Sequence, residues 1–170
     1  MPAAAHVMAS PVGPLRLVAR DGALVAIELV DEALTPEAPA EALLAGARGQ
    51  LEEYFAGRRR RFDLPLALEG SDFERAVWDC LRNIPFGTTR SYAAIAAELG
   101  RPGAARAVGA ANGRNPIAIV VPCHRVVGAD GSLTGYGGGL ERKRRLLALE
   151  GARLATVAQG ELGLPEPSGR

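Results

Sequence analysis

The chain has 170 residues, of which 48% are hydrophobic and 23% charged, a composition that fits a soluble globular protein of one large domain or two small ones. No apolar run approaches the roughly 18 residues of a membrane span, and the N-terminus lacks a charged-then-apolar signal pattern, so we expect a cytoplasmic protein with reduced thiols and no membrane partner. With only two cysteines and two histidines in the chain, we expect no four-ligand zinc site of the Cys/His kind.

The net charge of +1 conceals an uneven distribution. Residues 1–70 carry seven arginines against ten acidic residues, whereas residues 71–150 carry eleven basic against seven acidic residues. The basic half suits a polyanionic partner. Lys143 is the only lysine in the chain, so it is a candidate for a chemical role, with chance as the alternative.

The first 70 residues predict a small α/β domain. The expected elements are strands at 15–19 and 24–30 joined by a turn at Asp21-Gly22, a helix from Pro39 to Gly57, and a strand at 62–68. Four arginines at 58–61 fit a solvated loop, with a secondary phosphate contact as the alternative.

From residue 71 the pattern becomes helical. The expected elements are a helix capped by Ser71 or Asp72 that ends before a turn at 85–87 and has Cys80 on its buried face, a helix at 92–99 capped by Ser91, a short helix at 104–112, a short strand or wing at 133–136, and a helix at 141–150 with Leu146, Leu147 and Leu149 inward. The two short helices and their Gly-containing turn suggest a helix-turn-helix. We therefore expect a C-terminal domain at 71–155 and a flexible tail at 156–170.

The helix at 104–112 consists almost entirely of small residues. Small side chains let a helix approach DNA closely, as in a narrow minor groove, and Arg106 could then enter the base stack and hold open the gap left by a flipped nucleotide. An Ala-rich packing helix is the alternative.

Residues 115–126 contain the most informative pattern. The apolar run at 117–121 predicts a buried strand that Pro122 ends, and Cys123, His124 and Arg125 follow directly. A rigidly held cysteine beside a base and a fixed positive charge indicates covalent chemistry through a thiolate. The alternative is a structural cysteine, because adjacent side chains in a strand face opposite ways; chemistry requires either a turn at Pro122 or a bridging water.

Several other short motifs occur in the same half of the chain. They are Val77-Trp78, 84–88, Ser91-Tyr92, 105–109, 111–113, 115–126, 134–136 and 146–150. This set resembles the methylated-DNA–protein-cysteine methyltransferase family, the O6-alkylguanine-DNA alkyltransferases, closely over most of 71–150 and loosely before it. The resemblance implies an α/β N-terminal ribonuclease-H-like domain and a mainly α C-terminal winged helix-turn-helix domain.

The resemblance also implies a role for each candidate residue. Cys123 would accept the alkyl group, His124 would take the thiol proton through a water, and Glu150 would orient the imidazole. Tyr92 and Lys143 would support the departing guanine. The implied substrate-binding residues are Asn115, which would brace its turn, Val126, Tyr136 and Gly137, and the implied DNA-binding residues are Ser91, Ala105, Arg106, Ala107 and Gly109. Gly137 departs from the serine or alanine of many relatives, which leaves the substrate range open.

The implied activity is DNA repair by single, stoichiometric transfer of an alkyl group from O6-alkylguanine to Cys123, with a thioether as the product. O4-alkylthymine stays open as a second substrate. The alternatives are a non-catalytic sensor of alkylated DNA, against which Cys123 argues, and a cysteine hydrolase, which leaves Arg106 unexplained. We expect no metal or cofactor. The expected partner is double-stranded DNA containing alkylated bases, bound by a monomer, with cooperation along DNA left open.

Overall fold

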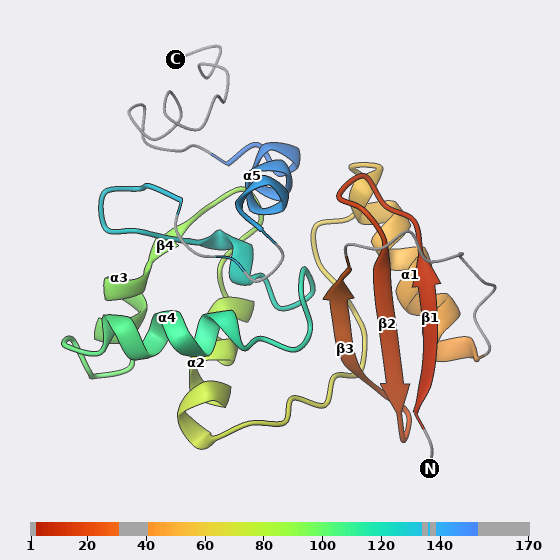
Figure 1. The fold of residues 1–170 in the computed structure, drawn as a ribbon, viewed down its shortest axis with the longest axis horizontal. Coiled ribbons are helices and arrows are strands. Elements are labelled where there is room, and N and C mark those ends of the chain that lie inside the picture. Colours follow the sequence, from red (N-terminus) through yellow and green to blue (C-terminus); the bar gives the residue numbers. More distant parts are fainter. Residues whose placement is uncertain (1–2, 31–40, 134–135, 137–138, 153–170) are drawn as a thin grey trace. The chain divides into compact units, whose positions relative to one another are not determined.

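The computed structural model describes residues 3–30, 41–133, 136 and 139–152. It forms two compact units, residues 1–71 with 115–121 and residues 72–114 with 122–170, and each is described by itself (Figure 1). The sequence places residues 115–121 in the C-terminal domain, whereas in the structure they pack with the first unit. The expected tail at 156–170 lies outside the described residues.

The first unit is built on a three-stranded antiparallel sheet. Its strands are β1 Ala4–Met8, β2 Leu15–Arg20 and β3 Ala23–Leu29, in the order β1-β2-β3, and helix α1 Ala42–Phe55 packs against them (Figure 1). The predicted hairpin turn is present, with Asp21 and Gly22 at φ 51° and 79°, the left-handed backbone that a two-residue hairpin turn requires. Sequence analysis missed β1, and the expected helix start at Pro39 lies outside the described residues.

Two predicted strands of this unit are wrong. The run at 62–68 contributes only an isolated bridge between Leu66 and Leu24. The run at 117–121 is a tight loop in which the Val121 N–H donates to the carbonyl of Ile117 at 3.0 Å and Ile119 has φ 73°. An apolar run indicates that a segment is buried but not which hydrogen bonds its backbone makes. Neither of these two runs forms the continuous hydrogen-bond ladder of a strand.

The second unit is mainly helical. Its elements are α2 Asp72–Arg82, β4 Arg90–Ser91, α3 Tyr92–Glu98, α4 Ala105–Gly113, the 3-10 turn η1 Cys123–Arg125, β5 Val126–Val127 and α5 Leu140–Leu149. Helix α4 packs against both α2 and α3 (Figure 1). The Trp78 indole N–H donates to the carbonyl of Ala111 at 2.9 Å, which ties α2 to α4 inside the core. The predicted cap is confirmed, because the Ser91 hydroxyl accepts from the Ala94 N–H at 3.0 Å.

Three details of the second unit differ from or extend the prediction. Leu133 and Tyr136 lie outside any strand, and residues 134–135 of the expected wing are not among the described residues; the strand pair that is present is β4 with β5, in parallel. Leu149 is 39% exposed, because it follows the last inward position of α5, while Leu146 and Leu147 are buried. Cys80 is buried as predicted.

No helix in the described ranges is both long and apolar enough for a bilayer span.

Candidate active site

Cys123 begins a tight turn rather than continuing a strand. Pro122 precedes η1, the Arg125 N–H donates to the Pro122 carbonyl at 3.0 Å, and the Val126 N–H donates to the Cys123 carbonyl. The cysteine is 6% exposed. The alternation of a strand therefore does not separate Cys123 from His124, and the turn that covalent chemistry requires is present.

His124 is held by a buried carboxylate. Its Nε2 lies 2.7 Å from Oε2 of Glu150, which follows directly after α5, and both side chains are buried. An ionised carboxylate can only accept, so Nε2 carries the proton and Nδ1 is left as the basic nitrogen. Nδ1 is buried and has no hydrogen-bond partner among the described residues. Burial lowers the pKa of His124, against the opposing influence of Glu150, so the neutral imidazole is favoured.

Arg125 completes this network. Its Nε and Nη2 donate to the two oxygens of Glu150, each at 2.9 Å, and its Nη1 donates to the Ile84 carbonyl at 2.7 Å. Burial raises the pKa of Glu150, but the hydrogen bonds from His124 and Arg125 outweigh it and lower the value to about 2. Arg125 follows Cys123 closely in the sequence, but its guanidinium binds Glu150. The two residues are 25 positions apart, so the local sequence does not reveal this pairing.

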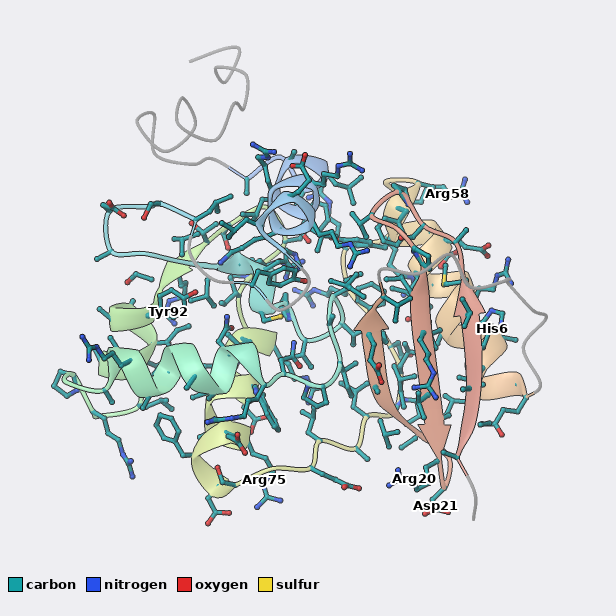
Figure 2. The ribbon with its side chains drawn as sticks, viewed as in Figure 1. His6, Arg20, Asp21, Arg58, Arg75 and Tyr92 are labelled. Carbon is teal, nitrogen blue, oxygen red and sulfur yellow. The ribbon has the colours of Figure 1, made fainter. Side chains whose placement is uncertain are left out.

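Lys143 and Tyr92 form a second polar group in the same unit. Tyr92 lies at the start of α3 (Figure 2). Lys143 is fully buried on α5, and its Nζ lies 6.0 Å from the centroid of the Tyr92 ring. Burial lowers the pKa of Lys143 to about 8, and the nearby Cys123 acts in the opposite direction. Lys143 therefore lies within electrostatic reach of the cysteine.

Four of the five candidate DNA-binding residues lie on α4, and the fifth, Ser91, is the half-buried N-cap of α3. Arg106 and Ala107 are exposed, Ala105 is half-buried, and Val108 and Ala111 on the opposite side are buried. A methyl group added at Gly109 would meet the Tyr92 ring at 3.7 Å, an ordinary contact distance. Helix α4 thus has one packing face and one exposed face, and Arg106 lies on the exposed one.

The candidate substrate-binding residues are dispersed. Val126 is buried and Tyr136 is half-buried in the second unit, and Gly137 lies outside the described residues. Asn115 belongs to the first unit, where its side chain donates to the Val121 carbonyl at 2.7 Å and accepts from the Ile117 N–H at 3.0 Å. These two bonds brace the 115–121 loop.

Two other sequence features have simple placements. Arg59 pairs with Glu53 at 2.8 Å, while Arg58, Arg60 and Arg61 are exposed after the end of α1, as expected for a solvated loop. Figure 2 labels Arg58 of this run. Among the described residues, no group of three or more His, Cys, Asp or Glu side chains is placed to hold a metal ion.

Comparison with known proteins gives a consistent result. Residues 4–68 match the family described as "6-O-methylguanine DNA methyltransferase, ribonuclease-like domain" and residues 72–152 match its "DNA binding domain". The methylated-DNA–protein-cysteine methyltransferase of Mycolicibacterium paratuberculosis is 57% identical over 145 residues, which cover 83% of this chain and 88% of the relative. The Mycobacterium leprae protein of the same name is 50% identical over 153 residues, 88% of this chain and 93% of the relative.

Solved structures agree with these relatives. The Mycobacterium tuberculosis O6-methylguanine methyltransferase superposes with a TM-score of 0.80 at 47% identity, covering 91% of this chain and 96% of that one. The M. tuberculosis protein in complex with DNA gives a TM-score of 0.79 at 51% identity, covering 89% and 95%. The sheet-containing first unit and the helical second unit thus correspond to the two domains of this architecture, and the chain belongs to the methylated-DNA–protein-cysteine methyltransferase family.

Proposed function

We propose that this protein repairs DNA by transferring the alkyl group of O6-alkylguanine to Sγ of Cys123, once per molecule. The observation that carries the proposal is the buried His124–Glu150–Arg125 network joined to the cysteine by a single turn. Such a network supplies a neutral base of fixed tautomer next to a thiol, which is what activation of a nucleophile requires.

The proposed reaction is an in-line displacement. Nδ1 of His124 takes the thiol proton through a water, and the sulfur attacks the carbon attached to guanine O6. A carbon–sulfur bond forms, the carbon–oxygen bond breaks, and its electron pair leaves with the guanine. Because the thioether has no route back to the thiol, the protein is spent after one transfer.

Tyr92 and Lys143 serve the leaving group in this proposal. An expelled guanine anion needs a proton or a nearby positive charge, and both side chains can donate. A lysine whose burial lowers its pKa to about 8 is charged at neutral pH yet gives up its proton more readily than an ordinary lysine. Its Nζ lies 6.0 Å from the centroid of the Tyr92 ring, which supports a joint role for the two donors.

Arg125 acts as a positioning residue for the base. It holds both oxygens of Glu150, which keeps the carboxylate ionised and its orientation fixed. Glu150 in turn keeps the proton on Nε2 of His124 and leaves Nδ1 basic. From the sequence, Arg125 was expected only as a fixed positive charge beside the thiol, and its pairing with Glu150 was not foreseen.

DNA is bound, in this proposal, through the α3–α4 pair as the helix-turn-helix of a winged C-terminal domain at 71–155, with a ribonuclease-H-like domain at 1–70. Arg106 replaces the flipped base, and Ser91, Ala105, Ala107 and Gly109 allow the backbone to approach closely. Val126, Tyr136, Gly137 and Asn115 are the proposed substrate-binding residues. The protein acts as a cytoplasmic monomer on double-stranded DNA containing alkylated bases.

A non-catalytic sensor of alkylated DNA fits these observations less well. A sensor does not need a thiol beside a base of fixed tautomer. Burying the charges of Glu150 and Arg125 costs free energy, and in a sensor no reaction would require it.

The test is intact-protein mass spectrometry after incubation with a duplex that contains one O6-methylguanine. We expect one added methyl group per chain, on the peptide that contains Cys123, and none with an unmodified duplex. Cys80 is an internal control, because burial raises the pKa of its thiol to about 11 and makes it a poor nucleophile. An unchanged mass together with intact binding to the damaged duplex would refute the transfer and favour the sensor.

A further inference from the structure

Asn112 links the exposed helix α4 to the nucleophile. It lies in the last turn of α4, is 3% exposed, and its Nδ2 donates to the backbone carbonyl of Cys123 at 3.4 Å. Exchanging the amide oxygen and nitrogen would set two acceptors against each other, so the donor assignment follows from the chemistry. The side-chain oxygen Oδ1 is buried and has no hydrogen-bond partner among the described residues.

Stability does not account for an asparagine at this position. The Cys123 carbonyl already accepts the Val126 N–H, so it would stay satisfied without Asn112. A bond of 3.4 Å is long and contributes little. A buried amide oxygen without a donor is unfavourable, and an apolar side chain of the same branching would avoid that loss.

The rest of α4 shows what this link connects. The Ala111 carbonyl, one residue before Asn112, accepts the Trp78 indole N–H at 2.9 Å, which fixes the end of the helix in the core. Arg106 and Ala107 are exposed nearer its start. The helix is therefore anchored at the end that reaches Cys123 and open at the end proposed to meet DNA.

We propose that Asn112 is a positioning residue that fixes the main chain of Cys123 relative to α4. This role rests on the proposed function: a base that leaves the duplex at α4 reacts only if Sγ lies in line with the carbon to be transferred. A displacement of about 1 Å between reacting groups can slow a reaction up to about 100-fold. The hydrogen bond from Asn112 can therefore affect the rate of transfer strongly even though it contributes little to folding stability.

The test compares Asn112→Leu with wild type. We expect unfolding stability at least equal to wild type, followed by the fluorescence of Trp78, and an unchanged Kd for duplex DNA. The single-turnover rate of transfer from a saturating O6-methylguanine duplex should fall about tenfold, as expected for a displacement smaller than about 1 Å. The rate of reaction with free O6-alkylguanine base should stay within about twofold of the wild-type rate, because α4 does not position that substrate.

Val108→Ala is the matched control, since Val108 is buried on the same helix. It should lower stability and leave the transfer rate per folded molecule unchanged. Asn112→Ala provides a second variant should the leucine chain fold poorly, and it should show the same selective loss on duplex DNA. Full transfer from duplex DNA by either folded Asn112 variant would overturn the role, as would equal losses with duplex and free base. Absence of transfer by the wild type would instead refute the proposed function itself.

Discussion

Replacing Lys143 with methionine should stabilise the second unit at neutral pH while it slows alkyl transfer. Lys143 is fully buried, and burial lowers its pKa from 10.5 to about 8. At about 1.4 kcal/mol for each pKa unit, keeping this lysine charged costs the folded state about 3 kcal/mol. Methionine has a similar length and no charge, so it should recover most of that free energy.

The pH dependence distinguishes this effect from a change in packing. Below pH 8 the lysine is protonated in both states and the folded state bears the full penalty. Between pH 8 and 10.5 the folded state releases its proton first, so the unfolded chain binds more protons and the free energy of unfolding rises with pH. The advantage of the Lys143→Met variant should therefore be largest below pH 8 and disappear near pH 10.5.

The assay is denaturant unfolding at a series of pH values, followed by the fluorescence of Trp78, the only tryptophan, which lies in the same unit as Lys143. Subtracting the two proteins cancels the titrating groups that do not interact with Lys143. Arg145→Met, at an exposed position of the same helix, should show no such pH-dependent difference. A Lys143→Met protein less stable than wild type at pH 7, or an advantage that does not change with pH, would refute the reasoning.

Three other changes should separate chemistry from binding. Cys123→Ser should abolish transfer and retain DNA binding in a mobility-shift assay; loss of both would indicate a structural cysteine. Glu150→Gln should slow transfer and lower stability by about 3 kcal/mol or more, measured by denaturation, because it leaves Arg125 buried without its anion; unchanged stability would contradict the role given to this ion pair. Arg106→Ala should reduce repair in duplex DNA more than reaction with free alkylated base, and equal losses would exclude the base-replacing role.

Periodicity and turn chemistry predicted most helices of this chain but not all of its strands. The helices around Val77, Ile95 and Leu147 appear where their spacing predicts them, because each buries one face. The apolar runs at 62–68 and 117–121 were read as strands, yet an apolar run reports burial and not hydrogen-bond pattern. Strand β1 was missed because its pairing with β2 is a tertiary contact that its own short sequence does not signal.

The local sequence and the family resemblance predicted the candidate site residues, but not the long-range contacts that hold them. The adjacent thiol and imidazole are visible in the sequence, which left a turn at Pro122 and a bridging water as alternatives, and the structure shows the turn. The pairing of Arg125 with Glu150 spans 25 positions, and nothing in the local sequence indicates which carboxylate a guanidinium will meet. The same holds for Asn112, whose unsatisfied oxygen can be recognised only once the packing around it is known.

The electrostatic surroundings of Cys123 change when it accepts an alkyl group. Glu150 is balanced by Arg125 and by the N–H of His124, whereas the neighbour that raises the pKa of Lys143 is Cys123. A cation beside the thiol favours the thiolate and the departing guanine anion. After transfer the sulfur is a neutral thioether, so it can no longer ionise and compensate the buried charge of Lys143. At a pH where the thiol of the unreacted protein is ionised, Lys143→Met should therefore stabilise the alkylated protein more than the unreacted one, and an equal or smaller stabilisation would show that Lys143 does not sense the charge of Cys123.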